Sequence, residues 1–441
     1  MSVTPWSPRI TLLFVLFWGF TFSLQAQIPT PAEQQSKSIL LLGATAHLGN
    51  GEVIKRSAIG FDKGKLKDVM AAIDIRLDTT QYDTIIHLPS KHIYPGFIAP
   101  NSRLGLVEVD AVRASRDFDD VGEFNPHVRA LSAYNTESRI TPTIRSNGVL
   151  LAQVAPKGGR ISGTSSVVQL DAWNWEDAVV RKDDGIHLNW PRLNSIRYAQ
   201  DAEKRKKAEE KYRDELEELK SFFLKAQAYS KSIFKVEQNL RYEAMRSLFK
   251  KEAKLYVHAT QVKQISDALF FTDQFNLDVV LVGAYDAWLL ADLIKDRNIP
   301  ILLRRVHSLP YYQDDDINTP YRLAAILHKK GILVGLENSG GMEAMGTRNL
   351  PFYAGTAAAY GVSKEEALAM ISLNTAKILG IEKQVGSIEV GKDATLFVSE
   401  GDALDMMTNQ LTHAFIQGRS ISLDNPQKQL YRKYSKKYQA D

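Results

Sequence analysis

The side chains best suited to metal or acid–base chemistry in this sequence are its nine histidines, because the chain contains no cysteine. Neutral imidazole is a common ligand of zinc and iron, and thiolate is the other frequent zinc ligand. No two histidines are separated by one or three residues, so the sequence has neither an H-x-H pair nor an H-E-x-x-H helix. The histidines are His47, His87, His92, His127, His187, His258, His307, His328 and His413.

Two further catalytic motifs are absent or incomplete. Residues 386–392 (Gly-Ser-Ile-Glu-Val-Gly-Lys) have the spacing of a phosphate-binding loop, but such a loop needs Ser or Thr next and then a helix. Asp393 and a predicted strand follow instead, so we expect no nucleotide site. The G-x-S-x-G elbow of serine hydrolases is missing, and the lack of cysteine excludes a disulfide scaffold, an iron–sulfur cluster and a thiol nucleophile.

The elements that would position any site fall into a β-rich start, an alternating middle and a β-rich end. Residues 38–95 are predicted as small antiparallel strands, with a hairpin turn at Asn50-Gly51. Near the other end, short strands are predicted at residues 387–393, 396–399, 413–417 and 419–423. The middle carries short apolar strands, the later ones each followed by a helix-like segment, at residues 94–98, 149–154, 167–170, 255–258, 279–282, 301–303 and 332–336.

Alternating strands and helices favour a parallel sheet, and this number of units favours a closed barrel. The predicted fold class is therefore α/β, a (β/α)₈ TIM-like barrel with small β-sheets from both chain ends. Residues 198–231 are rich in Glu and Lys at helical spacing. They are predicted to form either a solvated barrel helix or a helix that binds a partner.

The first residues have the order of a secretory signal peptide. Residues 1–26 contain one charge at Arg9, then an apolar run at 10–22, then small and polar residues. The run is shorter than the ~20 residues that a membrane span needs. We therefore expect cleavage near Ala26 and export as a soluble periplasmic or extracellular protein, with no membrane contact afterwards. With 55 basic and 51 acidic residues, the sequence predicts no nucleic-acid partner.

Several motifs resemble the amidohydrolase superfamily, especially its imidazolonepropionase-like branch. Residues 91–106 (Lys-His-Ile-Tyr-Pro-Gly-Phe-Ile-Ala-Pro-Asn-Ser-Arg-Leu-Gly-Leu) resemble the family's first barrel strand, and residues 42–51 resemble its opening hairpin. Further matches, in the family's order, are residues 349–352, 374–380 and 385–394. The resemblance implies a metal-bearing (β/α)₈ barrel over residues 96–384 and a composite β-sandwich of residues 38–95 plus 385–425.

The resemblance also implies hydrolysis of non-peptide C–N bonds, in which zinc or iron activates water in active relatives. Carried over position by position, most of the family's metal ligands are missing. The strand 5 histidine is present as His258, but the strand 8 aspartate falls on Asn338 and the strand 6 histidine falls on or near Gly283. The H-x-H pair falls on Asn101-Ser102-Arg103, and the aspartate before it on Ala99. Since such a site needs about four ligands, we expect no metal cofactor.

The candidate site residues follow from these positions. Catalytic candidates are His258, Arg103, Asn338 and His307, and ligand-binding candidates are Arg103, Asn101, Glu337 and Lys157. Two interpretations of Arg103 stay open. Its guanidinium either takes the place of the metal and binds an anion, or pairs with Glu337 or Glu108 and seals a disused pocket. His258 and His307 are each either catalytic or structural. Lys157 lies in a Gly-rich loop that either binds an anion or is an ordinary surface loop.

Three functions remain possible from the sequence. The first is a pseudo-enzyme that binds a small molecule or supports a partner, such as an active relative or a second copy of itself. The second is an active hydrolase of cyclic amides or acylated amines that uses a non-standard site. The third is a metal enzyme with an unrecognised set of ligands.

Overall fold

The computed structural model describes residues 30–72, 78–193, 201–232 and 237–438. These ranges cover most of the compact unit Pro31–Asp441, whereas the predicted signal peptide, residues 1–26, lies outside the described residues. In the ranges that are described, no helix is both long and apolar enough to cross a membrane.

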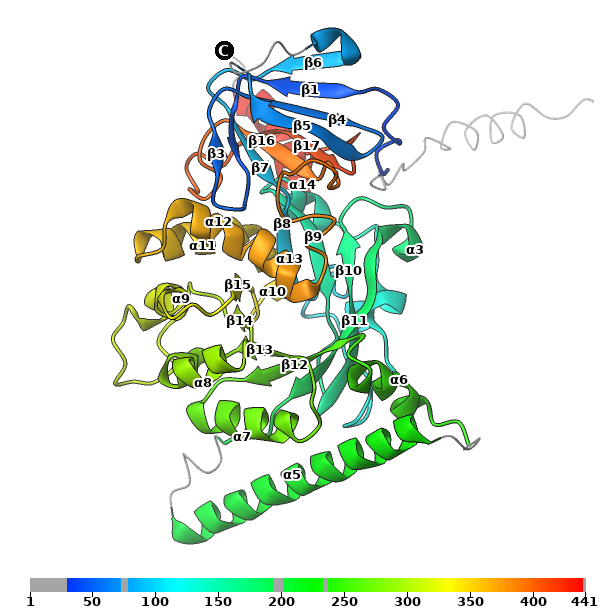
Figure 1. The fold of residues 1–441 in the computed structure, drawn as a ribbon, viewed down its shortest axis with the longest axis vertical. Coiled ribbons are helices and arrows are strands. Elements are labelled where there is room, and N and C mark those ends of the chain that lie inside the picture. Colours follow the sequence, from blue (N-terminus) through cyan, green and yellow to red (C-terminus); the bar gives the residue numbers. More distant parts are fainter. Residues whose placement is uncertain (1–29, 73–77, 194–200, 233–236, 439–441) are drawn as a thin grey trace, which may run out of the picture. The chain divides into compact units, whose positions relative to one another are not determined.

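An eight-stranded sheet in the order β15-β14-β13-β12-β11-β10-β9-β8 forms a nearly closed barrel (Figure 1). The two outermost strands, β8 and β15, contact each other. The strands are β8 (Phe97–Ser102), β9 (Val149–Val154), β10 (Ile161–Gln169), β11 (Val179–Asn189), β12 (Lys254–Ala259), β13 (Val279–Gly283), β14 (Ile301–Leu303) and β15 (Val334–Leu336). The predicted α/β class with a TIM-like barrel is confirmed.

The barrel departs from strict strand–helix alternation in its first half. Strand β10 runs antiparallel to both β9 and β11, while the other neighbouring pairs in the sheet are parallel. Strand β11 was not among the predicted strands, because its first half is the charged run Arg181-Lys-Asp-Asp184. The tight β9–β10 connection depends on Gly158 and Gly159, which have φ angles of +86° and +56°, a region that suits glycine. This connection carries Lys157.

The predicted strand at residues 94–98 belongs to two different sheets. The chain leaves strand β7 (His92–Pro95) and enters β8 (Phe97–Ser102) with only Gly96 between them. A side chain on Gly96 would press against Leu150 and Thr395. The absence of a side chain therefore lets the chain pass from the terminal sheet into the barrel.

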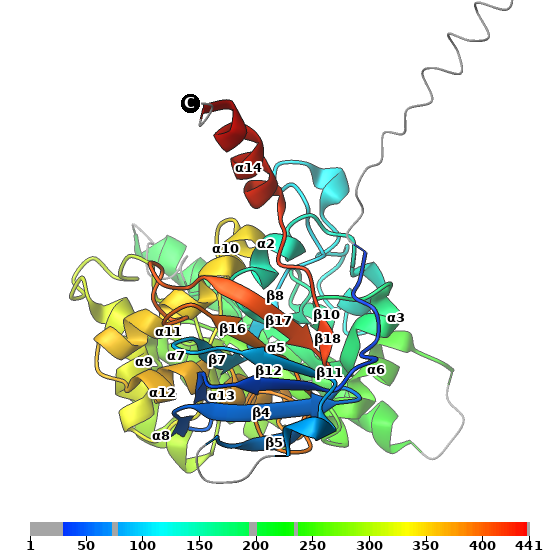
Figure 2. The same cartoon turned by 90° about the horizontal axis from the view of Figure 1, so that it is seen from above.

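The terminal sheets combine the two ends of the chain. A six-stranded sheet has the order β18-β17-β16-β7-β2-β3, and a four-stranded sheet has the order β5-β4-β1-β6. Figure 2 shows β7, β16 and β17 side by side, in agreement with their antiparallel pairing. The remaining strands are β1 (Ile39–Leu42), β2 (Thr45–His47), β3 (Val53–Ile54), β4 (Ser57–Asp62), β5 (Lys65–Ala71), β6 (Thr84–His87), β16 (Leu396–Ser399), β17 (Leu411–Ile416) and β18 (Arg419–Ser420).

Apolar residues from both ends share one core, which includes Leu41, Ile59, Ile93, Leu396 and Phe415. The predicted boundaries of the composite domain, 38–95 plus 385–425, stay a prediction.

Two expectations about these terminal strands were wrong. Pairs β1–β4, β4–β5 and β2–β3, the last joined through Asn50-Gly51, are antiparallel as predicted, but pairs β1–β6 and β2–β7 are parallel. Residues 387–393 form no strand, apart from an isolated bridge between Asp393 and Lys65. Gly386 and Gly391 have φ angles of +96° and +90°, which turn the chain at both ends of this run.

Helices cover the second half of the barrel most regularly, with α7 (Val262–Asp273), α8 (Ala291–Asp296) and α9 (Thr319–Lys329) between successive strands β12 to β15. The long charged stretch forms α5 (Ala202–Lys231), and residues 198–200 of that prediction lie outside the described residues. Buried Tyr212, Leu219, Phe223 and Ala226 of α5 recur at helical spacing, which is typical of a helix with one packed face.

The other α-helices are α2 (Thr141–Arg145), α3 (Trp175–Ala178), α6 (Leu240–Phe249), α10 (Glu343–Gly346), α11 (Leu350–Ala359), α12 (Lys364–Met370), α13 (Leu373–Leu379) and α14 (Pro426–Tyr438). Short 3₁₀-helices are η1 (Thr79–Gln81), η2 (Arg113–Ser115), η3 (Ala130–Ala133), η4 (Tyr285–Leu290) and η5 (Thr347–Asn349).

Candidate functional site

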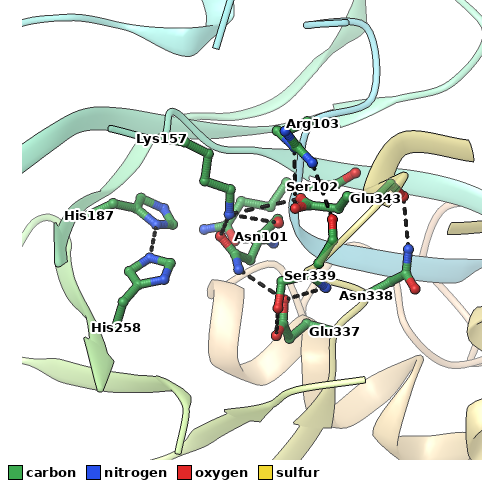
Figure 3. A network of polar contacts seen from close by, with 12 residues as sticks. Asn101, Ser102, Arg103, Lys157, His187, His258, Glu337, Asn338, Ser339 and Glu343 are labelled. Carbon is green, nitrogen blue, oxygen red and sulfur yellow. Dashed lines mark hydrogen bonds and ion pairs between the residues drawn. The ribbon is translucent and has the colours of Figure 1, made fainter. Parts of the chain in front are cut away.

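The candidate side chains gather where the parallel barrel strands end. Asn101 and Ser102 close β8, Lys157 follows β9, and Glu337 and Asn338 directly follow β15 (Figure 3). His187 lies near the end of β11, and His258 near the end of β12. Barrel chemistry is usually built at this end of the strands, because the loops that follow them converge there.

Two imidazoles face each other at this end. His187 Nδ1 lies 2.9 Å from His258 Nε2, and the His187 ring also stacks on Tyr256. The buried Nε2 atom of His187 has no hydrogen-bond partner among the described residues. Because an unpaired buried N–H costs more than an unpaired acceptor, the proton belongs on Nδ1, which then donates to His258 Nε2.

Both imidazoles are held neutral. Burial lowers the pKa of His258 well below its ordinary value, and the positive charge of Lys157 lowers it further. Burial is also the main cause that lowers the pKa of His187, with smaller effects of His258 and Lys157. At neutral pH both imidazoles are therefore expected to be uncharged, with the Nδ1 proton of His187 in the hydrogen bond between them.

The ammonium group of Lys157 is tied into the same network. Its Nζ donates to Asn101 Oδ1 at 2.5 Å and lies 3.9 Å from Glu343 Oε1. Asn101 has a left-handed backbone with φ of +50°, a conformation that Asn tolerates better than most residues. Its backbone N–H donates to Gln153, and its side-chain amide donates to Glu337 at 2.9 Å.

Glu337 is a fully buried carboxyl group. It accepts hydrogen bonds from the Asn101 amide, from the backbone N–H of Ser339 at 3.0 Å and from the Ser339 hydroxyl. Burial raises its pKa to about 6, and the charge of Lys157 opposes that shift. A carboxyl group with such a pKa can both take up and release a proton near neutral pH.

Asn338 stands where the family has an aspartate, and both ends of its amide are used within the protein. Its nitrogen donates to the carbonyl oxygen of Glu343 at 2.8 Å, and its oxygen accepts from the Tyr353 hydroxyl at 2.5 Å. This packing explains why a neutral amide is stable there, because each of these polar atoms has a partner.

Arg103 has a different partner from the two that were predicted. Its Nε lies 3.3 Å from Glu343 Oε2, and its guanidinium lies over the Phe118 ring at 4.6 Å. Neither Glu337 nor Glu108 is its ion-pair partner in the structure. The side chain of Glu343 is only 4 % exposed, so the pair neutralises a nearly buried carboxylate.

His307 lies apart from this network. Its Nε2 is 2.7 Å from the Thr356 hydroxyl, and its ring contacts Tyr353 edge-on. Burial is the main cause that lowers its pKa. The structure therefore brings together His258, Asn101, Glu337 and Lys157, but not His307.

A cavity of about 290 Å³ opens beside His258 and Glu337. It is also lined by Ser339, by Gly283 at the end of β13, and by two arginines that the sequence did not single out, Arg192 and Arg304. Neither Arg103 nor Lys157 lines this cavity.

Sequence reasoning also missed a buried polar cluster that spans strands β9 to β12. Asp184 accepts hydrogen bonds from Tyr256, Ser165 and Gln153, and burial raises its pKa. Both Asp184 and His187 lie on β11, whose charged first half concealed the strand. The apolar residues Ile186 and Leu188 that flank His187 are the one sequence signal that could have indicated it.

The residues present do not fit the metal site that the family resemblance implies. Among the described residues, no group of three His, Cys, Asp or Glu side chains could hold a metal ion. The facing nitrogens of His187 and His258 are used on each other, and Glu337 already accepts three hydrogen bonds. Besides burial, the positive charge of Lys157 lowers the pKa of both imidazoles, and this charge would repel a divalent cation.

Two of three comparisons with known proteins find similar proteins. Residues 315–424 match the model of the amidohydrolase family. A comparison with curated proteins finds no match. Among solved structures, an amidohydrolase from Thermotoga maritima MSB8 has a TM-score of 0.73 and 23% identity, over 87% of this chain and 99% of that chain.

Two other solved structures are more distant. A Xaa-Pro dipeptidase with bound methionine in its active site has a TM-score of 0.53 and 13% identity, over 87% of this chain and 100% of its own. An adenosine deaminase from Xanthomonas campestris with bound zinc has a TM-score of 0.52 and 12% identity, over 94% of this chain and 100% of its own. The barrel fold and the match over residues 315–424 confirm the resemblance of this chain to the amidohydrolases.

Proposed function

We propose that this protein is a metal-free, amidohydrolase-like protein that binds a small ligand at the mouth of its barrel and does not hydrolyse C–N bonds. The observation that carries the proposal is the ammonium of Lys157, which hydrogen-bonds Asn101 and lies 3.9 Å from Glu343. Burial is the main cause that lowers the pKa of His187 and His258, and the charge of Lys157 lowers both further. A fixed positive charge thus acts on the imidazoles that a metal would need.

The electrostatics of the mouth support this proposal. A catalytic divalent ion works by lowering the pKa of a bound water and polarising the substrate carbonyl. An ammonium group has three donors and no open coordination position. It pairs with the Glu343 carboxylate and donates a hydrogen bond to Asn101, without supplying activated water.

The first test is turnover. The mature protein should release no amine or ammonia from acylated amines, cyclic imides or dipeptides, and added zinc, manganese or a chelator should change nothing. Hydrolysis that a chelator abolishes would contradict the proposal.

A second candidate function rests on Glu337. Its pKa of about 6 and its place in the wall of the cavity suit a general base that takes a proton from water. In that case turnover would survive the chelator, and Glu337→Gln would abolish it. Loss of turnover in E337Q, with no loss in the surface control Glu243→Gln, would favour this hydrolase over the pseudo-enzyme.

Export and partner support are part of the same proposal. Export is supported by residues 1–26, which have the charge, apolar run and small polar residues of a signal peptide in that order. Support of a partner is supported by the loss of most of the family's metal ligands. Mass spectrometry of the N-terminus and light scattering of the purified protein test the two. An uncleaved N-terminus would contradict export, and a monomer at all concentrations would contradict self-association.

A further inference from the structure

The cavity at the barrel mouth has an unusual balance of charge. Arg192 follows β11 and Arg304 follows β14, and both line the cavity. Among the described residues that line the cavity, Glu337 alone carries a carboxyl group. The lining therefore combines two guanidinium groups with one buried acid that already accepts three hydrogen bonds.

Neither of the two arginines forms an ion pair with the described residues. Across the described ranges, no ion pair or side-chain hydrogen bond is found for Arg192 or Arg304. Residues 194–200 (Asn-Ser-Ile-Arg-Tyr-Ala-Gln), which follow Arg192 closely in sequence, contain no Asp or Glu. By contrast, Arg103 in the same mouth is paired with Glu343.

We propose that Arg192 and Arg304 bind the anionic oxygens of a small molecule, a carboxylate or a phosphate, inside this cavity. The planar guanidinium group presents donors in a geometry that matches both kinds of oxoanion. The volume of about 290 Å³ corresponds to about ten water molecules, so the ligand has on the order of ten non-hydrogen atoms.

The residues that line the cavity beside the two arginines define the rest of the ligand. Ser339 and Glu337 lie on the wall formed after β15, and His258 is held neutral at the end of β12. The nitrogens of Gln264 and Asn189 are already bonded to backbone oxygens. The ligand is therefore a compact anion with a polar neutral portion, rather than a long apolar acid.

This inference rests on the proposed function, because a metal ion in the mouth would itself bind an anion. The experiment is calorimetric titration of the mature protein, treated with a chelator, with succinate, with inorganic phosphate and with neutral succinamide. We expect succinate or phosphate to bind and succinamide not to bind. Binding of one anion alone identifies the carboxylate or the phosphate as the ligand group.

Arg192→Met and Arg304→Met should each weaken binding at least about tenfold, since each removes charge-assisted hydrogen bonds, and should leave the melting temperature without ligand unchanged. Arg192→Lys should restore part of the affinity. The matched control is Arg322→Met on α9, which removes the same charge from a surface pair with Asp316 and should bind as the parent does.

The inference is overturned if no anion binds, if succinamide binds equally well, or if both arginine variants bind as the parent does. If anions bind only before treatment with the chelator, a metal is responsible and the proposed function fails as well. If the treated protein does not bind and also lacks metal and turnover, the anion site fails while the proposed function stands.

Discussion

Glu343 is nearly buried and receives two cations, Arg103 at 3.3 Å and Lys157 at 3.9 Å. Removing one partner of such a pair leaves a charge without compensation, which costs more than the pair itself contributes. In the barrel mouth, the charges of Arg103, Lys157 and Glu343 therefore compensate one another. The groups available to a ligand are those that line the cavity.

Arg103→Ala should lower the free energy of unfolding by about 3 kcal/mol, because the Glu343 carboxylate is then left with Lys157 alone. The double variant R103A/E343A should lose clearly less than the sum of the two single variants. Urea unfolding of the four proteins measures the coupling. Additive effects would show that Arg103 does not stabilise the fold through Glu343.

Glu337 should make stability depend on pH. Its pKa is about 6 in the folded protein against 4.5 as the ordinary value, so the folded state binds the proton more tightly. The stabilisation is fully present below pH 4.5 and is lost as the pH rises through 6. Since one pKa unit corresponds to about 1.4 kcal/mol, the parent should lose about 2 kcal/mol relative to E337Q over this range.

Urea unfolding of both proteins at pH 4.5, 5.5 and 7 checks this expectation. Other groups titrate in the same range, and the comparison with E337Q removes their common contribution. Parallel stability curves for the two proteins would contradict the role assigned to burial of Glu337.

At the scale of elements, strand β16 joins the two ends of the chain. It lies between β7 and β17, and each of its residues is buried. Sheets with few strands rarely cover an apolar face on their own. The helix α14 differs, since none of its residues is buried.

Truncation after Gly386 should therefore leave an insoluble or molten product, because β16, β17 and β18 are lost from the six-stranded sheet. Truncation after Asn425 removes only α14 and the residues that follow it, and is the matched control. It should melt cooperatively near the parent temperature in differential scanning calorimetry. A chain ending at Gly386 that melts like this control would refute the shared sheet.

For the whole molecule, periodicity was enough to predict the barrel, since strands β12 to β15 read as apolar runs with helices between them. It did not predict that β10 runs antiparallel, or that β11 exists, because the charges of residues 181–184 hide that strand. His187 and Asp184 were missed for the same reason.

The candidate site was predicted in part. Asn101, Glu337 and Lys157 do meet near His258, because strand ends converge in a barrel. The partner of Arg103 and the cavity arginines could not be predicted, since they depend on loop paths that no local pattern encodes. For example, Glu343 begins α10 directly after Met342, whose left-handed backbone has a φ of +53° and sets the path of the loop before the helix.

If Lys157 and the paired histidines leave no place for a metal ion, the purified protein holds none. Elemental analysis for zinc, iron and manganese, on mature protein purified without added metal or chelator, tests it most directly. We expect well under one metal ion per chain, and no gain in melting temperature on adding zinc. About one tightly held zinc, iron or manganese ion per chain would contradict it.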